Sequence, residues 1–240
     1  MPVKNKRKQP HSNRFISAAQ HVEADKLYSV VEAIEKVQAA ASTKFVESID
    51  VSIKLGIDPK KSDQNVRGTT NIPHGTGKKK TVAVLAKGDH VKEAEDAGAD
   101  FVGSDDLITK IQGGFKEFDV ILATEEMAPQ IGKIGKALGP KTPNKRNGTV
   151  TNQIGNAVKE IKAATRIEYR ADKGGVVSVP LGKVNFTSAQ IQENFKAAVH
   201  AVIKAKPSST KGKYLVSCTL SSTMGPGFPL DVSDVTKFSE

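Results

Sequence analysis

The sequence has little cysteine and few aromatic residues: Cys218 is the only cysteine, tryptophan is absent, and Phe, Trp and Tyr together make up 5% of 240 residues. A single cysteine excludes an intrachain disulfide and a zinc site built from cysteines. The shortage of aromatic side chains argues against a base-stacking platform for single-stranded nucleic acid. No apolar stretch approaches the roughly 18 residues of a membrane span, and no apolar run follows the basic N-terminus as in a secretory signal. We therefore expect a soluble protein of a reducing compartment, with no membrane partner.

Charge, in contrast, is plentiful and unevenly placed. Lys and Arg total 36 against 26 acidic residues, which gives a net charge of +10. Residues 1–14 and 194–230 each carry five cations and no acid, whereas residues 89–106 carry seven acids against Lys92 alone. Such a surplus favours a polyanionic partner, because each neutralised phosphate releases condensed counterions; a merely well-solvated surface is the alternative. We expect the first dozen residues to form a disordered basic arm.

Both ends of the chain show the patterns of an α+β unit. Apolar spacing predicts a helix over residues 30–41, and alternation predicts a strand with one buried face over 49–55. A hairpin of strands 166–171 and 176–181 is expected next, followed by a long amphipathic helix. A last strand should bury Tyr214, Val216, Cys218 and Leu220 and expose Ser217, Thr219, Ser221 and, in the same phase, Thr223.

The middle of the chain has a different pattern. Apolar segments at 81–86, 101–103 and 120–123 alternate with helical segments. Strands that are apolar on both faces indicate a small parallel sheet covered by helices. The predicted fold class is therefore α/β and α+β in two domains, with an α/β domain at residues 76–165 inserted into an α+β domain built from residues 1–75 and 166–240.

No motif indicates catalysis, a cofactor or a metal. Gly75-Thr76-Gly77-Lys78 resembles part of a phosphate-binding loop, but Ile72 and Lys79 occupy the positions where that loop needs a glycine and a hydroxyl. The histidines show no metal-ligand spacing, and the paired acids Asp105-Asp106 and Glu125-Glu126 lie near expected helix starts, where carboxylates suit the helix dipole. The protein is predicted not to be an enzyme; an α/β enzyme that uses a nucleotide is the main rival hypothesis.

Basic residues and strand hydroxyls are the remaining signals. Phosphate contacts orient a protein without specifying sequence. Serine and threonine on an exposed strand face can hydrogen-bond ribose 2′-hydroxyls, which mark RNA and not DNA, although an ordinary solvent-facing strand fits equally well. A general basic nucleic-acid coat protein is therefore a second rival. The basic residues form two groups: Lys60, Lys61, Arg67 and Lys78–Lys80, and Lys133, Lys136, Lys141, Lys145 and Arg146.

Several ordered segments are spread from residue 43 to residue 227: Lys44-Phe45 with Glu47 and Asp50, Leu55–Pro59, Ser62–Gly68, Pro73–Lys78, Gly148–Thr151 and Ser222–Gly227. The strings Asp-Gln-Asn-Val-Arg-Gly and Thr-Met-Gly-Pro-Gly within them are individually specific. Together these segments resemble the family of ribosomal protein L-one, the protein of the mobile side stalk of the large ribosomal subunit.

The resemblance implies a structural constituent of the large ribosomal subunit that binds the ribosomal RNA of the side stalk. It implies a Rossmann-like inserted domain joined by a hinge, and a stalk that moves as deacylated tRNA leaves the exit site. It also implies partners: exit-site tRNA, other ribosomal components and, in bacterial members, the protein's own messenger RNA, whose translation they repress. The expected location is cytoplasmic; an organelle of bacterial descent stays open as the alternative.

Carried over position by position, the family's RNA contacts fall on both ends of the chain. Periodicity alone places Phe45 on the buried face of its strand, but Glu47 interrupts that phase, and we follow the family in expecting Phe45 at the RNA. The expected RNA-binding residues are Lys44, Phe45, Asp50, Asp172, Lys173, Thr223, Met224 and Gly225. The family pattern is broken at Lys141–Asn147, a loop two residues shorter than usual and without its methionine, so no RNA contact is carried over to this loop.

Overall fold

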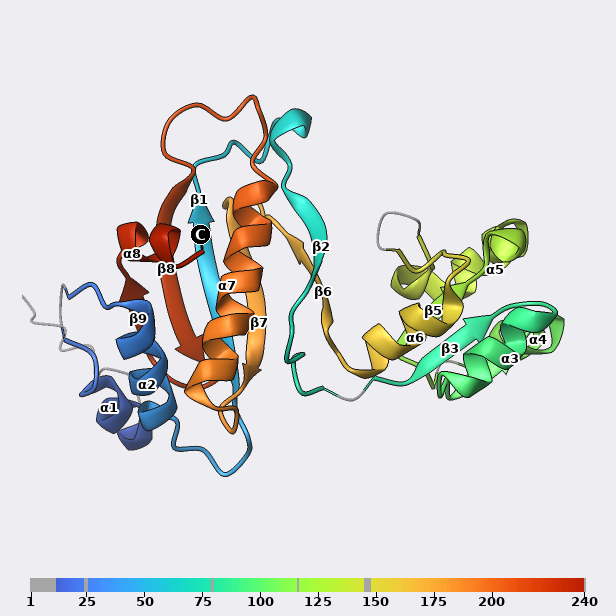
Figure 1. Cartoon of the computed structure of the whole chain (residues 1–240), viewed down its shortest axis with the longest axis horizontal. Coiled ribbons are helices and arrows are strands. Elements are labelled where there is room, and N and C mark those ends of the chain that lie inside the picture. Colours follow the sequence, from blue (N-terminus) through green and yellow to red (C-terminus); the bar gives the residue numbers. More distant parts are fainter. Residues whose placement is uncertain (1–11, 24–25, 79, 116, 145–147, 240) are drawn as a thin grey trace, which may run out of the picture.

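The computed structural model describes residues 12–23, 26–78, 80–115, 117–144 and 148–239. The predicted basic arm, up to His11, and residues 145–147 of the shortened loop lie outside the described residues. The chain forms two lobes (Figure 1). One is built from both chain ends, and we call it the terminal lobe; the other is built from the middle of the chain, and we call it the central lobe.

The terminal lobe has a four-stranded antiparallel sheet in the order β7-β1-β8-β9. Its helices α2 and α7 pack against the sheet (Figure 1). A serine N-cap starts α2, and a capping box of Thr187 and Gln190 starts α7. The elements are α1 (Asn13–Ala19), α2 (Val30–Ala40), β1 (Ser48–Leu55), β7 (Val176–Lys183), α7 (Ser188–Lys204), β8 (Leu215–Ser222), β9 (Gly227–Leu230) and α8 (Val232–Ser239), with a short 3-10 turn, η1, at Ser62–Gln64.

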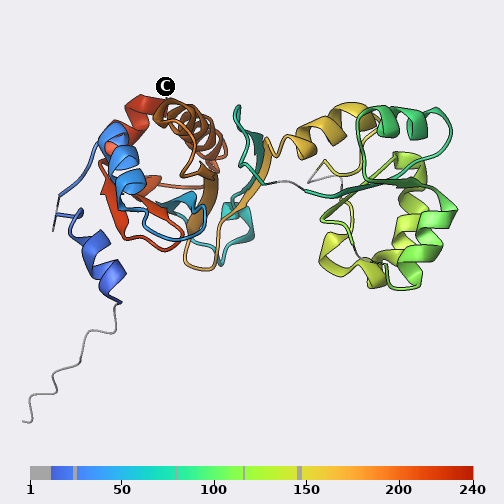
Figure 2. The same cartoon turned by 90° about the horizontal axis from the view of Figure 1, so that it is seen from below.

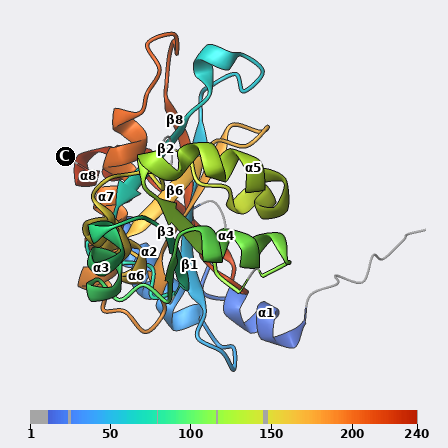
Figure 3. The same cartoon turned by 90° about the vertical axis from the view of Figure 1, so that its right-hand side faces the viewer.

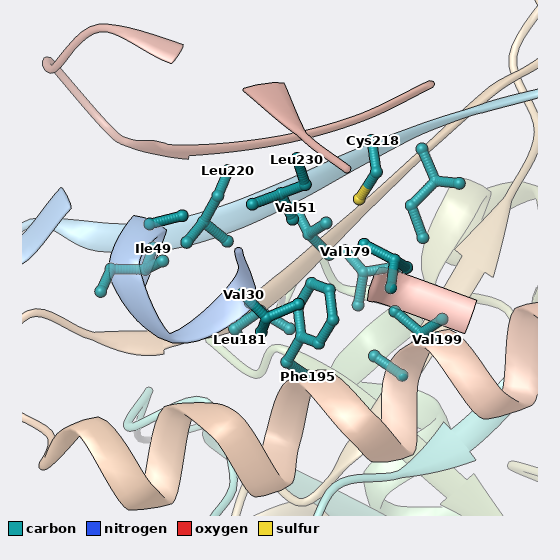
Figure 4. Packing of buried hydrophobic residues seen from close by; sticks show 14 of the residues in the cluster. Val30, Ile49, Val51, Val179, Leu181, Phe195, Val199, Cys218, Leu220 and Leu230 are labelled. Carbon is teal, nitrogen blue, oxygen red and sulfur yellow. The ribbon is translucent and has the colours of Figure 1, made fainter. Parts of the chain in front are cut away.

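Alternation along β1 gives this sheet two different faces. Ile49, Val51 and Ile53 are fully buried and join the core shown in Figure 4, together with Phe195 of α7. The intervening residues lie on the opposite face, where Ser52 is only half-buried and its hydroxyl is 3.2 Å from that of exposed Ser178. The predicted strand with one buried face is confirmed.

The central lobe has a three-stranded parallel sheet in the order β4-β3-β5. Ala83 and Leu85 of β3 join one hydrophobic cluster, and Val82 and Val84 join another, so both faces of this strand are covered. The predicted small parallel sheet is confirmed. Its elements are β3 (Val82–Leu85), α3 (Asp89–Asp96), β4 (Phe101–Gly103), α4 (Asp105–Gln112), β5 (Val120–Ala123), η2 (Glu125–Met127), α5 (Ala128–Leu138), η3 (Gly139–Lys141) and α6 (Ile154–Lys162).

A two-stranded ribbon leads from one lobe to the other (Figure 2). It pairs β2 (Arg67–Asn71) with β6 (Arg166–Arg170). The pairing continues toward the central lobe, because the N–H of Thr76 donates to the carbonyl oxygen of Ala164 at 3.0 Å. The predicted hairpin is therefore wrong in its pairing: β6 pairs with β2, and β7 pairs with β1.

A second expectation also fails in the last strand. Val216 is 52% exposed and not buried. The register of β1 and β8 shifts between Lys54 and Leu55, where Leu55 lies opposite Leu215. Such an irregularity moves the side chains before it out of the alternating phase. Sequence analysis also gave no indication of α1, β9 or α8.

Candidate nucleic-acid interface

The start of β1 and the end of β8 lie side by side. Ile49 pairs with Ser222, and the N–H of Thr223 donates to the carbonyl oxygen of Ser48 at 3.0 Å, so the pairing continues beyond β8. Two segments far apart in the sequence therefore meet at one end of the terminal sheet. We call residues 43–47 the entry segment and residues 222–225 the Met224 turn.

The Thr223 hydroxyl joins the Met224 turn to Ser48, the first residue of β1, directly after the entry segment. Its Oγ1 accepts a hydrogen bond from the N–H of Ser48 at 3.0 Å and donates to the carbonyl oxygen of the same residue at 3.2 Å. A hydroxyl has one donor and two acceptor positions, so one acceptor position remains available. Thr223 is exposed, so an incoming hydroxyl could donate to it.

The Met224 main chain is held at both of its polar atoms. Its N–H donates to Glu47 Oε2 at 2.9 Å, and Arg14 Nη2 of α1 donates to its carbonyl oxygen at 3.0 Å. The Met224 side chain is 48% exposed. The turn is thus fixed through its backbone while its apolar side chain faces outward.

Glu47 is the buried centre of this arrangement, with 2% of its surface exposed. Its Oε2 also accepts from the Ser222 hydroxyl at 2.7 Å. Burial alone would raise the pKa of the Glu47 carboxyl, but hydrogen bonds, chiefly from the Met224 N–H and the Ser222 hydroxyl, lower the pKa below its ordinary value and favour the charged form. Both of these donors reach Oε2, whereas the buried Oε1 has no hydrogen-bond partner among the described residues.

Gly225 is required by the turn itself. A Cβ atom at this position would lie 2.4 Å from the Ser222 hydroxyl oxygen. That oxygen is the donor to Glu47, so a larger residue would disturb the contact that holds the turn. The close approach that glycine permits here is to Ser222.

Phe45 and Lys44 are both exposed on the entry segment, Phe45 to 55%. The expectation that Phe45 is not a core residue is confirmed. The physical reason is that β1 begins only at Ser48, so the alternation of the strand does not extend back to Phe45. Phe45, Met224 and the neighbouring Val46 are three of the large apolar side chains that the described part of the chain leaves exposed.

Asp50 lies on the hydroxyl-bearing face of β1, opposite Ser221 of β8. Burial raises the pKa of the Asp50 carboxyl above its ordinary value, although the charges of Lys78 and Lys183 act in the opposite direction. A half-buried carboxylate accepts hydrogen bonds and repels phosphate, so Asp50 suits amino and hydroxyl groups as ligands and not phosphates.

Asp172 and Lys173 are not brought together with the other expected site residues. They lie in the turn before β7, where Gly175 accepts from the N–H of Leu55 at the far end of β1. Eight residues of β1 separate the two ends, which is about 23 Å of strand. Asp172 also stabilises its own turn, since its Oδ1 accepts from the N–H groups of Gly174 and Val176 at 2.8 Å each.

The segment Gly75–Lys78 does not form a phosphate cradle. The N–H of Gly75 donates to Ile72 and that of Thr76 to Ala164, so both backbone donors are engaged within the protein. Among the described residues, no group of three or more His, Cys, Asp or Glu could hold a metal ion. No helix in the described part of the chain is long and apolar enough to cross a membrane.

Sequence reasoning missed three residues that shape the interface. Arg14 donates to the Met224 carbonyl, Ser48 is bonded to the Thr223 hydroxyl, and Ser222, within the turn, donates to Glu47. Of the residues that hold the turn, Glu47 had a signal, as an acid in phase with the buried residues of β1. Arg14 could not be assigned, because nothing in the sequence pairs α1 with residue 224.

The arrangement described above defines a class: a protein with a preformed, partly apolar and hydroxyl-bearing surface at the end of an open sheet. The model of the ribosomal protein L1p/L10e family matches residues 37–226. The chain is also 48% identical over 227 residues to the large ribosomal subunit protein uL1 of Chlamydia pneumoniae, covering 94% of this chain and 97% of that protein.

The chain belongs to the ribosomal protein L1p/L10e family. It is therefore a structural component of the ribosome, in the cytoplasm, and not an enzyme. The matched residues 37–226 include the entry segment, the Met224 turn and the whole central lobe, whereas Arg14 and α1 precede them.

Proposed function

We propose that this chain is a structural constituent of the large ribosomal subunit that binds the ribosomal RNA of the mobile side stalk through the terminal lobe. The observation that carries the proposal is the juxtaposition of the entry segment and the Met224 turn. It brings the segment that carries exposed Phe45 to the turn that carries exposed Met224 and the Thr223 hydroxyl, and the backbone of that turn is already fixed. The proposed RNA-binding residues at this end are Lys44, Phe45, Asp50, Thr223, Met224 and Gly225.

The Thr223 hydroxyl supports RNA over DNA as the ligand. Its proton is directed to the Ser48 carbonyl, so its remaining capacity is to accept a hydrogen bond. A ribose 2′-hydroxyl can donate to it, and deoxyribose cannot. Asp172 and Lys173 are proposed as a second contact, reached by an RNA that runs along β1.

We further propose two domains that pivot on each other, with boundaries at residues 1–75 and 166–240 for the first domain and 76–165 for the second. The buried residues of the two lobes form separate clusters, and the β2–β6 ribbon leads from one to the other. Such a ribbon permits the lobes to move as units. This motion would assist the release of deacylated tRNA from the exit site.

The proposed RNA ligand is tested by comparing two nucleic acids in filter binding. The stalk RNA and a duplex DNA of equal length are titrated at about 200 mM salt, where non-specific contacts are weak. Much tighter binding of the RNA supports the proposal. Equal affinity would leave a general basic coat protein as the better account, and saturable binding of ATP, GTP or NAD in equilibrium dialysis would favour the nucleotide-using rival.

We also propose repression of the chain's own messenger RNA as a second role of the same surface, on the ground of the family resemblance. A reporter gene placed behind the leader of that message should fall in expression when the protein is supplied in trans. The reporter should recover with Thr223→Val. Unchanged expression with the wild-type protein would remove this role and leave the ribosomal role intact.

A further inference from the structure

The peptide groups around Met224 are held by two charged side chains of opposite sign. The Glu47 carboxylate accepts from the Met224 N–H at 2.9 Å, and the Arg14 guanidinium donates to the Met224 carbonyl at 3.0 Å. Hydrogen bonds with one charged partner are shorter and roughly twice as strong as neutral ones. The three residues come from three separate segments: α1, the entry segment and the turn after β8.

These contacts fix the turn without burying its side chain. Met224 is 48% exposed, so neither contact serves to pack that side chain into a core. A free turn would lose conformational freedom when RNA binds, and this loss would subtract from the affinity. A turn that is already held avoids most of that loss.

We propose that Glu47 and Arg14 are positioning residues of the RNA interface, which hold the Met224 main chain so that its side chain and the Thr223 hydroxyl meet the RNA in a fixed geometry. The inference rests on the proposed function, since it concerns how that same surface is organised. Neither residue needs to touch the RNA. Arg14 also makes α1 part of the interface.

Glu47→Gln distinguishes a positioning role from a purely electrostatic one, because the two roles predict opposite changes in RNA affinity. Removing a negative charge next to an RNA site should strengthen binding if only long-range charge matters. If Glu47 holds the turn, glutamine leaves only neutral hydrogen bonds to the Met224 N–H and the Ser222 hydroxyl. We expect the RNA affinity to fall about three- to tenfold. Unchanged or tighter binding would overturn the role of Glu47.

For Arg14→Gln, the salt dependence of RNA affinity distinguishes a positioning role of Arg14 from a direct phosphate contact. A cation that neutralises one phosphate contributes about one unit to the slope of log affinity against log salt concentration. We expect Arg14→Gln to weaken binding about threefold or more at every salt concentration, with the slope unchanged. A slope lower by about one unit would show that Arg14 meets a phosphate, and full affinity would show that it does nothing; either result overturns its positioning role.

Lys196→Gln is the matched control for the loss of a cation. Lys196 is exposed on α7, which covers the face of the terminal sheet opposite its hydroxyl-bearing face. It should change the affinity by less than about twofold. A loss equal to that of Arg14→Gln would mean that any cation of this lobe matters equally, and would overturn the special role of Arg14.

Methyl NMR of the methionines in the full chain provides the structural readout. The chain has only three methionines, Met1, Met127 and Met224, and Met127 is fully buried in the central lobe. Stalk RNA should shift the Met224 signal and leave Met127 in place. In the free protein, Glu47→Gln and Arg14→Gln should each move the Met224 signal toward that of a mobile side chain, again with Met127 unchanged.

The same spectra distinguish failure of the inference from failure of the proposed function. If RNA leaves the wild-type Met224 signal unchanged, the proposed interface itself is wrong. If RNA shifts that signal but both variants bind and resonate as wild type does, only the positioning inference is wrong. If Glu47→Gln unfolds the terminal lobe, the positioning inference is tested by Arg14→Gln on the surface helix α1 alone.

Discussion

The two lobes each contain a sheet, but helices cover one face of the terminal sheet and both faces of the central sheet. In β1 every second residue enters the core and the others stay on a hydroxyl-bearing face. In β3 all four residues are buried, in alternation toward two clusters. An open face leaves room for a ligand, whereas a doubly covered sheet leaves only its edges and loops. This difference supports the proposal that the terminal lobe binds the RNA.

The largest expected effects come from substitutions in the hydrophobic cores, which should affect RNA binding differently in the two lobes. Phe195→Ala removes a fully buried ring from the terminal lobe and should cost about 3–5 kcal/mol of unfolding free energy. RNA binding should fall with the stability, because that lobe carries the proposed interface. Urea unfolding and filter binding measure the two effects.

Leu122→Ala is the partner substitution in the central lobe, where Leu122 is also fully buried. It should cost about 2–5 kcal/mol locally and leave the RNA affinity of the folded terminal lobe within about twofold. Equal loss of RNA binding from both substitutions would break the comparison between the lobes.

Thr223→Val has the next largest expected effect, on binding and not on the core. It removes the hydroxyl that accepts from and donates to Ser48 and that we propose accepts from ribose. Specific RNA binding should weaken by about 1–3 kcal/mol, the cost of leaving polar partners unpaired. Thr223→Ser keeps the hydroxyl and should bind nearly as well; a folded Thr223→Val protein with full affinity would exclude the hydroxyl contact.

A smaller effect concerns the stability of the central lobe in acid. A hydrogen bond from Lys162 at 2.7 Å, and a second from the Val82 N–H, lower the pKa of the Asp100 carboxyl. A carboxyl with a lowered pKa stabilises the folded state above its ordinary pKa, and this stabilisation is lost as the pH falls through the lowered value.

Asp100→Asn should remove that pH dependence and cost less than about 1 kcal/mol at neutral pH, because the Asp100 side chain is 33% exposed and its ion pair is screened. Urea titrations between neutral and acid pH measure the change. Asp96→Asn on the surface of α3 is the control. The same pH dependence in Asp100→Asn as in the wild-type protein would refute the assignment.

The smallest effect on specificity is expected from the basic arm. Neutralising Lys4, Lys6, Arg7 and Lys8 together should lower the salt slope of RNA binding. The ratio of specific to non-specific affinity should stay the same, since phosphate contacts carry no sequence information. A selective loss of stalk RNA binding would show instead that the arm reads a particular structure.

Much of the fold could be predicted because strong hydrophobic patterns are local. The alternation of β1 and the strands of the central lobe that are apolar on both faces can be recognised from neighbouring residues alone. The pairing of β6 with β2 is not local: the short turn at Gly174 suggested a hairpin, and only the three-dimensional arrangement of the lobes selects the other partner. The exposure of Val216 could not be predicted for a similar reason, because the register shift opposite Leu55 has no signature in the sequence.

The candidate site, too, could be predicted only in part. The resemblance indicated Phe45 and Thr223, and the fold places them at one end of the sheet. It could not indicate that Asp172 lies about 23 Å away along β1, nor that Glu47 and Arg14 both contact the Met224 peptide groups. These relations depend on which segments meet in space, and a sequence alone does not contain them.

Chemical footprinting of total large-subunit ribosomal RNA with the purified chain tests the central claim most directly. Protection should be confined to one region, the side stalk, and should be lost with Thr223→Val but kept with Leu122→Ala. Protection spread evenly over the RNA, or a footprint that depends on the central lobe and not on Thr223, would contradict the assignment of RNA binding to the terminal lobe.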